Sequence, residues 1–211
     1  MHQKNITAAG VSLDKAEKVL IMIHGRGGSA EDILSLGAYL NVADFALLAP
    51  QATGNTWYPY SFMAPVAQNE PWLSSALTLL QAQVDELVQS GKKRENIYFL
   101  GFSQGACLTL EFTARNANRY GGVVAFTGGL IRDKINNDNY KGNFGNTPIF
   151  IGSSNPDPHI PVERVYASSN ILRDMGANVV EKVYAGMGHT INNDEIEQVN
   201  QLMFNSTATK S

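Results

Sequence analysis

Cysteine is almost absent from this sequence, because Cys107 is the only one among 211 residues. A lone cysteine cannot form an internal disulfide, so the chain gives no sign of an oxidising compartment. The four histidines are scattered, and neither a Cys-x-x-Cys nor a His-Glu-x-x-His spacing occurs. These absences argue against a metal site.

Long apolar runs and an excess of one charge are also missing. The longest apolar run near the start covers residues 19–23, far fewer than the ~20 residues of a membrane-spanning helix. Residues 1–15 lack the apolar core of a secretion signal. The 16 basic and 19 acidic side chains give a formal charge of −3, with no basic stripe. We therefore expect a cytoplasmic protein with no membrane insertion and no nucleic-acid partner.

Short apolar runs alternate along the chain with segments of helical periodicity. Most runs are continuously apolar, which is typical of parallel strands covered on both faces. The expected strands cover residues 18–24, 45–50, 96–101, 122–128, 148–153 and 178–186. The expected helices cover residues 29–40, 71–91, 162–175 and 194–204. This order predicts one α/β domain over residues 1–211, with a mostly parallel central sheet and helices on both faces.

The two ends and two connections have weaker patterns. Residues 1–17 fit either an edge hairpin that turns near glycine 10 or an extended arm, and residues 205–211 predict a frayed tail. The connections at residues 51–71 and 130–147 are long for a compact domain. Loops of this length are more often functional or mobile than idle. The sequence does not decide whether these two act as a partial lid over a site.

The segment Gly-Phe-Ser-Gln-Gly at residues 101–105 ends an apolar strand and precedes a helix. A Gly-x-Ser-x-Gly turn in this context holds a serine exposed at the carboxyl edge of a sheet. Side chains at Gly101 or Gly105 would collide where strand and helix close around the serine. Ser103 is therefore the candidate nucleophile, although the segment alone also fits an ordinary glycine-rich turn.

A serine nucleophile needs a base that takes its proton and a carboxylate that orients the base. The base we expect is His189, in a glycine-flanked loop after a strand. The acid we expect is Asp157, which also follows a strand and lies between two prolines that stiffen its loop. His159 is placed at the rim of the site, and Asp194 is assigned to a helix cap.

A second glycine-rich strand exit, His-Gly-Arg-Gly-Gly, covers residues 24–28. Its glycines allow the backbone to approach a substrate closely. We expect the backbone amides of Arg26 and Gln104 to form an oxyanion hole for the candidate nucleophile. The ring of His24 is expected to brace the loop instead of acting as a base.

Apolar and aromatic side chains in the first long connection are candidates for an acyl or aromatic pocket. They are Trp57, Tyr58, Tyr60, Phe62 and Met63, joined by His159 at the rim. Ordinary packing under the loop is the alternative for half of them. Cys107 lies one helical turn after the candidate serine and is expected to be buried, not reactive.

Four motifs together carry a resemblance to a known family. They are His-Gly-Arg-Gly-Gly, Gly-Phe-Ser-Gln-Gly-Ala, Asp-Pro-His-Ile-Pro and Gly-Met-Gly-His, in this order within residues 19–204. The sequence resembles the small carboxylesterases of the phospholipase/carboxylesterase family, relatives of the acyl-protein thioesterases. The resemblance implies a compact α/β-hydrolase with little or no lid, which hydrolyses esters or thioesters without a cofactor. It also implies Ser103, Asp157 and His189 as catalytic triad, and Arg26 and Gln104 as oxyanion residues.

These features predict a serine carboxylesterase that hydrolyses short- to medium-chain or aromatic esters through an acyl-enzyme. Arg26 stands where the thioesterase branch commonly has an apolar residue, which argues against long acyl chains. The alternative is an acyl-protein thioesterase or lysophospholipase. A second alternative is a non-catalytic small-molecule receptor on a hydrolase scaffold. The expected partner is a small-molecule ester, and a homodimer is left open.

Overall fold

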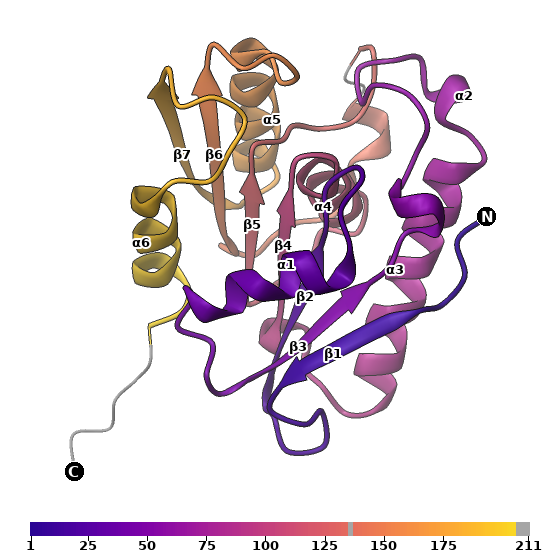
Figure 1. Ribbon diagram of the computed structural model, residues 1–211, viewed down its shortest axis with the longest axis vertical. Coiled ribbons are helices and arrows are strands. Elements are labelled where there is room, and N and C mark those ends of the chain that lie inside the picture. Colours follow the sequence, from indigo (N-terminus) through magenta and orange to yellow (C-terminus); the bar gives the residue numbers. More distant parts are fainter. Residues whose placement is uncertain (135–136, 206–211) are drawn as a thin grey trace.

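The computed structural model describes residues 1–134 and 137–205, and its strands form one seven-stranded sheet in the order β1-β3-β2-β4-β5-β6-β7 (Figure 1). The strands are β1 (Ile6–Gly10), β2 (Lys18–Ile23), β3 (Phe45–Pro50), β4 (Ile97–Phe102), β5 (Gly122–Phe126), β6 (Pro148–Asn155) and β7 (Asn178–Ala185). All neighbouring pairs from β3 to β7 are parallel, so the carboxyl ends of these strands lie at one edge. The predicted, mostly parallel sheet is confirmed.

Strand β1 is antiparallel to β3, with Ile6 opposite Pro50 and Gly10 opposite Ala46. Because β3 lies between β1 and β2, the beginning of the chain forms an edge strand and not a hairpin with the next strand. At the other end, residues 206–211 of the expected tail lie outside the described residues.

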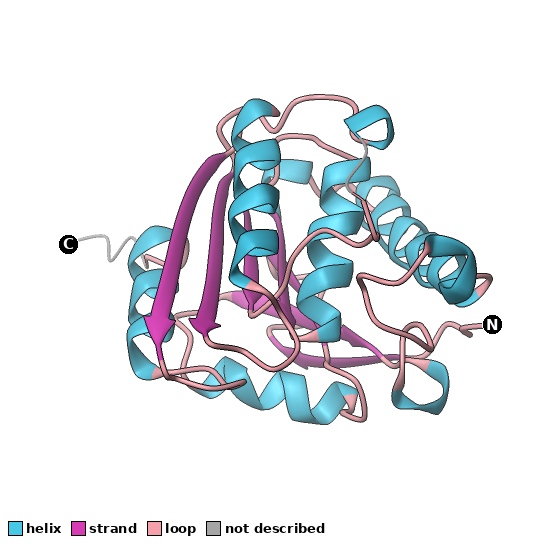
Figure 2. Ribbon diagram, turned by 90° about the horizontal axis from the view of Figure 1, so that it is seen from above, coloured by secondary structure: helices cyan, strands magenta, loops and turns pink. Residues whose placement is uncertain are grey.

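Helices cover both faces of the sheet (Figure 2). They are α1 (Ala30–Leu34), α2 (Val66–Asn69), α3 (Trp72–Gln89), α4 (Gln104–Arg115), α5 (Val162–Asp174) and α6 (Asn193–Leu202). Helices α3, α4 and α5 share one core with Ile21 and Phe99, whereas α1 and α6 share the other with Leu20 and Leu100. Neighbouring residues of a strand thus enter opposite cores, which explains why the strand sequences are continuously apolar.

The two long connections contain only short helices where the structure describes them. Residues 51–71 form a one-turn 3-10 helix, Thr53–Asn55, and α2. In the connection at residues 130–147, the described part is held at its base by Glu111, which accepts hydrogen bonds from the Ile131 amide (3.0 Å) and the Tyr140 hydroxyl (2.9 Å). Residues 135–136 of this connection lie outside the described residues. No described helix is long and apolar enough to cross a membrane.

The predicted cap of the last helix is wrong by two residues. Asn192 is the N-cap of α6 and forms a capping box with Glu195, whereas Asp194 lies in the first turn. The carboxylate of Asp194 instead accepts a hydrogen bond from the Tyr184 hydroxyl (2.6 Å). The capping box fixes the end of the loop that carries His189, because Asn192 follows that loop directly.

The Glu195 side chain is buried against β6. One of its oxygens accepts a hydrogen bond from the Asn192 amide (2.9 Å), and the other, Oε1, has no hydrogen-bond partner among the described residues. A Cβ atom added at Gly152 would lie 1.9 Å from Oε1, so only glycine fits opposite this carboxyl. Burial raises the pKa of Glu195 to about 7.

We expect Glu195→Gln to stabilise the protein more at pH 8 than at pH 5. The folded carboxyl has a higher pKa than the unfolded one, so the folded chain binds more protons between pH 4.5 and 7 and loses stability as the pH rises through 7. Glutamine does not titrate and so avoids this loss. Relative to the wild-type protein, the free energy of unfolding of the variant should therefore be higher at pH 8 than at pH 5 by roughly 2 kcal/mol. Urea unfolding of both proteins at both pH values measures it. An equal effect at pH 5 and pH 8 would contradict the prediction.

Candidate active site

The predicted nucleophile turn forms between β4 and α4. Ser103 has φ +54° and ψ −118°, a conformation that non-glycine residues rarely adopt. A Cβ atom at Gly101 would lie 2.3 Å from the Gly105 carbonyl oxygen, and one at Gly105 would lie 2.1 Å from that of Ile23. The steric reason predicted for both glycines is therefore confirmed. The Ser103 amide donates to the Phe126 carbonyl oxygen (2.9 Å), which ties the turn to β5.

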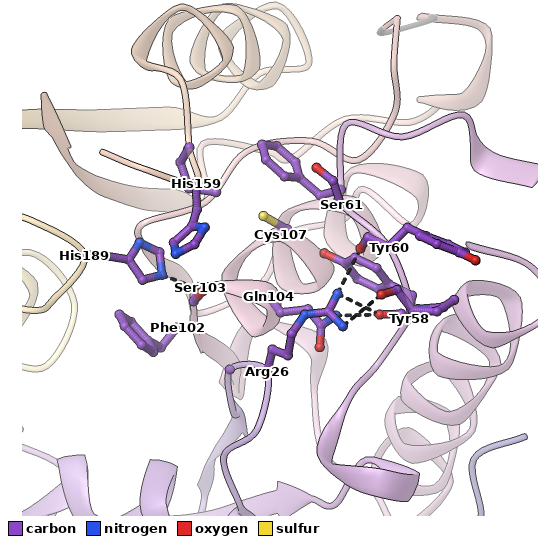
Figure 3. A pocket seen from close by; sticks show the side chains of 14 residues that line it. Arg26, Tyr58, Tyr60, Ser61, Phe102, Ser103, Gln104, Cys107, His159 and His189 are labelled. Atoms are coloured by element: carbon purple, nitrogen blue, oxygen red, sulfur yellow. Dashed lines mark hydrogen bonds between the residues drawn. The ribbon is translucent and has the colours of Figure 1, made fainter. Parts of the chain in front are cut away.

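Three side chains from separate strand exits form one hydrogen-bonded chain. Ser103 Oγ lies 2.7 Å from His189 Nε2, and His189 Nδ1 lies 2.9 Å from Asp157 Oδ2. Figure 3 shows the hydrogen bond between Ser103 and His189. If the Nδ1 proton is shared with the carboxylate, Nε2 is free to accept the proton of the serine hydroxyl. The structure thus brings together the three residues that the sequence analysis selected, in an arrangement suited to nucleophilic catalysis.

The Asp157 side chain is fully buried, and both of its carboxylate oxygens accept hydrogen bonds. Its second oxygen accepts hydrogen bonds from the amides of His159 (2.7 Å) and Ile160 (2.9 Å). Burial alone would raise the pKa of Asp157, but the hydrogen bonds from His189 and from these two amides outweigh it and hold the pKa below its ordinary value. Asp157 therefore remains a carboxylate at neutral pH and can fix the orientation of the imidazole.

Two rings hold the His189 imidazole in place. The Phe102 ring centroid lies 5.4 Å from that of His189, and the His159 ring packs edge-on at 4.8 Å. The loop before His189 is tied to β6, because the Gly188 amide donates to Ser154 Oγ (3.0 Å). The ring is thus restrained by packing and by its own hydrogen bonds.

The two predicted oxyanion amides are available beside Ser103. Gln104 is the first residue of α4, so its amide has no acceptor within the helix and lies at the positive end of the helix dipole. In the loop after β2, the Gly27 and Gly28 amides donate to backbone carbonyl oxygens, whereas the Arg26 amide makes no backbone hydrogen bond within the described chain. Arg26, Ser103 and Gln104 line the same pocket.

The buried ring of His24 forms hydrogen bonds that hold the loop after β2 in place. Its Nδ1 lies 2.7 Å from the Gly25 carbonyl oxygen, and its Nε2 accepts a hydrogen bond from the Ala52 amide (3.1 Å). This pattern requires a neutral ring with the proton on Nδ1, and burial lowers the pKa of His24 accordingly. The predicted bracing role of His24 is confirmed by this geometry.

The Arg26 and Gln104 side chains have a further role that the sequence did not reveal. Both bind the segment at residues 56–60, of which Tyr58, Pro59 and Tyr60 line the pocket (Figure 3). The Arg26 guanidinium donates to Thr56 Oγ1 (2.9 Å) and to the carbonyl oxygens of Tyr58 (2.9 Å), Pro59 (3.0 Å) and Tyr60 (2.9 Å). Gln104 accepts from the Trp57 amide (2.8 Å) and donates to the Tyr58 carbonyl oxygen (2.8 Å). The side chains of the two predicted oxyanion residues therefore hold this wall of the pocket in place.

We expect Arg26→Met to lower kcat/KM for ester hydrolysis by roughly 10- to 100-fold, even though the backbone amide remains. Without the guanidinium, the loop of Arg26 and residues 56–60 lose four hydrogen bonds, and a displacement of about 1 Å in such a site costs about 10²-fold. Arg26→Lys keeps the charge but not the planar fork, so it should resemble the methionine variant. Steady-state kinetics measure the effect, and wild-type kcat/KM in both variants would contradict it.

A pocket of about 590 Å³ opens in front of Ser103. Tyr58, Phe62 and His159 line it, but Trp57 and Met63 do not. Met63 is partly buried against the core. Trp57 is fully buried, and its indole Nε1 donates to the His24 carbonyl oxygen (2.9 Å). For these two residues the packing alternative holds, and their assignment to the pocket is corrected.

The sequence analysis did not assign some of the pocket residues. Phe102 and Ile160 line the pocket, and each directly adjoins a motif residue, Ser103 or His159. This adjacency was the available signal. Cys107 also lines the pocket and is buried as predicted. Burial raises the pKa of its thiol to about 12, so it stays protonated at neutral pH and is a poor nucleophile.

Among residues 1–134 and 137–205, no group of three or more His, Cys, Asp or Glu side chains could hold a metal ion.

Comparisons with known proteins identify the family of this chain. A family model described as phospholipase/carboxylesterase matches residues 5–205. Acyl-protein thioesterase 1 of Saccharomyces cerevisiae is 28% identical, over 89% of this chain and 92% of that protein. The "Probable carboxylesterase SOBER1-like" of Arabidopsis thaliana is 26% identical, over 86% and 76%. The crystal structure of a phospholipase/carboxylesterase from Dyadobacter fermentans is 55% identical, with a TM-score of 0.95, over 97% and 98%. The family model covers nearly the whole chain, so this protein belongs to the phospholipase/carboxylesterase family of α/β-hydrolases.

Proposed function

We propose that this protein is a serine carboxylesterase that hydrolyses short- to medium-chain or aromatic esters. The strongest support is the hydrogen-bonded chain of Ser103, His189 and Asp157, with donor–acceptor distances of 2.7 and 2.9 Å at the mouth of a pocket. The family includes esterases and thioesterases, which both attack an acyl carbonyl group.

In the proposed mechanism, His189 Nε2 takes the proton of Ser103 as its oxygen attacks the ester carbonyl carbon. The negative charge that develops on the carbonyl oxygen is stabilised by the Arg26 and Gln104 amides. The carbon–oxygen bond to the alcohol then breaks, and His189 gives its proton to the departing oxygen. In the second half of the reaction, His189 takes a proton from water, which attacks the carbonyl carbon of the acyl-enzyme. The bond to Ser103 Oγ then breaks, His189 returns the proton to Ser103, and the acid is released. Asp157 keeps its negative charge throughout and stabilises the charged imidazole.

The lining of the pocket supports shorter or aromatic acyl groups. Phe62, Cys107 and Ile160 offer apolar surface, but Ser61 and His159 interrupt it with polar groups. A long acyl chain needs a continuous apolar channel, whereas a short or aromatic group can be held by a mixed pocket.

A thioesterase is the second candidate, because the same nucleophile and base can attack a thioester and the yeast relative carries that name. A non-catalytic receptor is disfavoured, since the three side chains lie at hydrogen-bonding distance.

A substrate panel separates these candidates. Purified wild-type protein and Ser103→Ala would be assayed with p-nitrophenyl esters from acetyl to palmitoyl, with a benzoyl ester and with the matching thioesters. We expect the highest kcat/KM for butyryl to octanoyl or benzoyl esters, with a decline toward palmitoyl. A maximum for long-chain thioesters would favour the thioesterase. Lack of turnover with every substrate would favour the receptor.

A further inference from the structure

A second groove of about 260 Å³ opens beside the candidate catalytic residues. It shares Gly25, Arg26 and Phe102 with the pocket described above. Its remaining lining consists of His24, Gly28, Asp32, Ile33, Leu36 and Ile191. The groove therefore adjoins the site through these three residues, and its other walls come from α1, the turn after α1 and the loop after His189.

The surface of this groove is mainly apolar. Ile33 is buried, and Leu36, Phe102 and Ile191 are partly buried against the core shared by α1 and α6. The one carboxylate, Asp32, is engaged in the cap of α1, where it accepts a hydrogen bond from the Ser29 amide (2.8 Å). The Arg26 guanidinium is bound to the carbonyl oxygens of Tyr58 and Tyr60, away from Phe102 (Figure 3). An apolar group is thus the best fit.

The position of the groove relative to His189 indicates which part of an ester would occupy it. Phe102 packs against the His189 ring (5.4 Å between centroids), and Ile191 follows His189 by two residues. In Figure 3, Phe102 and His189 lie on one side of Ser103, whereas Tyr58 lies on the other. His189 must protonate the departing alcohol, so the alcohol leaves on the side of Phe102.

We propose that this groove binds the apolar alcohol part of the ester, while the larger pocket holds the acyl part. This inference rests on the proposed esterase function. A volume of 260 Å³ equals that of roughly eight or nine water molecules in the liquid, enough for a butyl, hexyl or benzyl group. Burial of these groups against Leu36, Phe102 and Ile191 favours esters of larger apolar alcohols over methyl esters.

The test compares methyl, butyl, hexyl and benzyl acetates, which keep the acyl part constant. We expect kcat/KM of the wild-type protein to rise by roughly tenfold or more from methyl to hexyl acetate. Leu36→Trp should fill the groove and reduce the hexyl-to-methyl ratio toward one. Leu13→Trp is the matched control, because Leu13 is exposed and does not line the groove; it should leave the ratio unchanged.

Ile191→Ala is a second variant, which removes apolar contact surface from the groove and adds no bulky side chain. It should also lower the hexyl-to-methyl ratio of kcat/KM. Circular dichroism confirms the folding of each variant. Equal kcat/KM for all alcohols, or an unchanged ratio in both folded groove variants, would overturn the groove assignment while leaving the esterase intact. Absence of turnover with every acetate and every ester of the acyl panel would instead contradict the proposed function.

Discussion

Ser103→Ala should lower kcat for ester hydrolysis by about 10⁴- to 10⁶-fold. The Ser103 hydroxyl is the group that His189 Nε2 reaches at 2.7 Å, and alanine removes both the nucleophile and this hydrogen bond. The oxyanion amides and the pocket remain, so a small residual rate above that in water is expected. Initial rates over a range of enzyme concentrations measure the loss, with the variant expressed separately to exclude wild-type contamination.

A double variant provides the control for this effect. His189→Ala alone should cause a loss of similar size, and the double variant Ser103→Ala, His189→Ala should be little worse than either, because the two residues act as a unit. Independent effects that multiply would mean that the two side chains do not cooperate. Retention of wild-type kcat by Ser103→Ala would exclude Ser103 as the nucleophile.

Gly105→Ala should have the second large effect, on folding as well as on activity. A Cβ atom at this position would lie 2.1 Å from the Ile23 carbonyl oxygen and 2.5 Å from that of His24, so α4 must move away from β2. Backbone atoms cannot yield as a flexible side chain can, and we expect a loss of roughly 3 kcal/mol in the free energy of unfolding. Activity should fall too, because Ser103 and the Gln104 amide would move with the start of α4.

Gly91→Ala is the matched control for this prediction. Gly91 follows α3 with φ +94° and has no atom within 4 Å of an added Cβ, so only backbone strain opposes alanine there. That strain costs roughly 1 kcal/mol, and the site should be unaffected. Urea unfolding monitored by circular dichroism compares the two variants. A loss no larger in Gly105→Ala than in Gly91→Ala would show that the close approach at Gly105 is not needed.

Much of the arrangement was predictable because the parallel sheet imposes it. Continuous apolar runs predicted the inner strands, and parallel strands place their carboxyl ends at one edge. Ser103, Asp157 and His189 each follow such a strand, so their convergence followed from the fold once the order of motifs was recognised. The glycines of the nucleophile turn were predictable from the Gly-x-Ser-x-Gly pattern, and the contact that excludes a side chain at Gly101 is local, whereas the one at Gly105 is with Ile23 of β2.

The features that sequence reasoning missed depend on contacts between distant segments. The pairing of β1 with β3 depends on which edge of the sheet is vacant, and β1 alone carries no signal for this. Trp57 turns into the core because the His24 carbonyl oxygen lies beneath it. The Arg26 contacts depend on the path of residues 56–60, and the second groove depends on the fold bringing Leu36 and Ile191 to the same surface.

The most direct test is to map where a fluorophosphonate modifies the protein covalently. It asks whether Ser103, His189 and Asp157 together make an activated nucleophile. Intact-mass and peptide mass spectrometry should show one adduct per chain, on Ser103, and its formation should be strongly slowed in His189→Ala. Modification at another residue, or an active preparation that stays unmodified, would contradict the account.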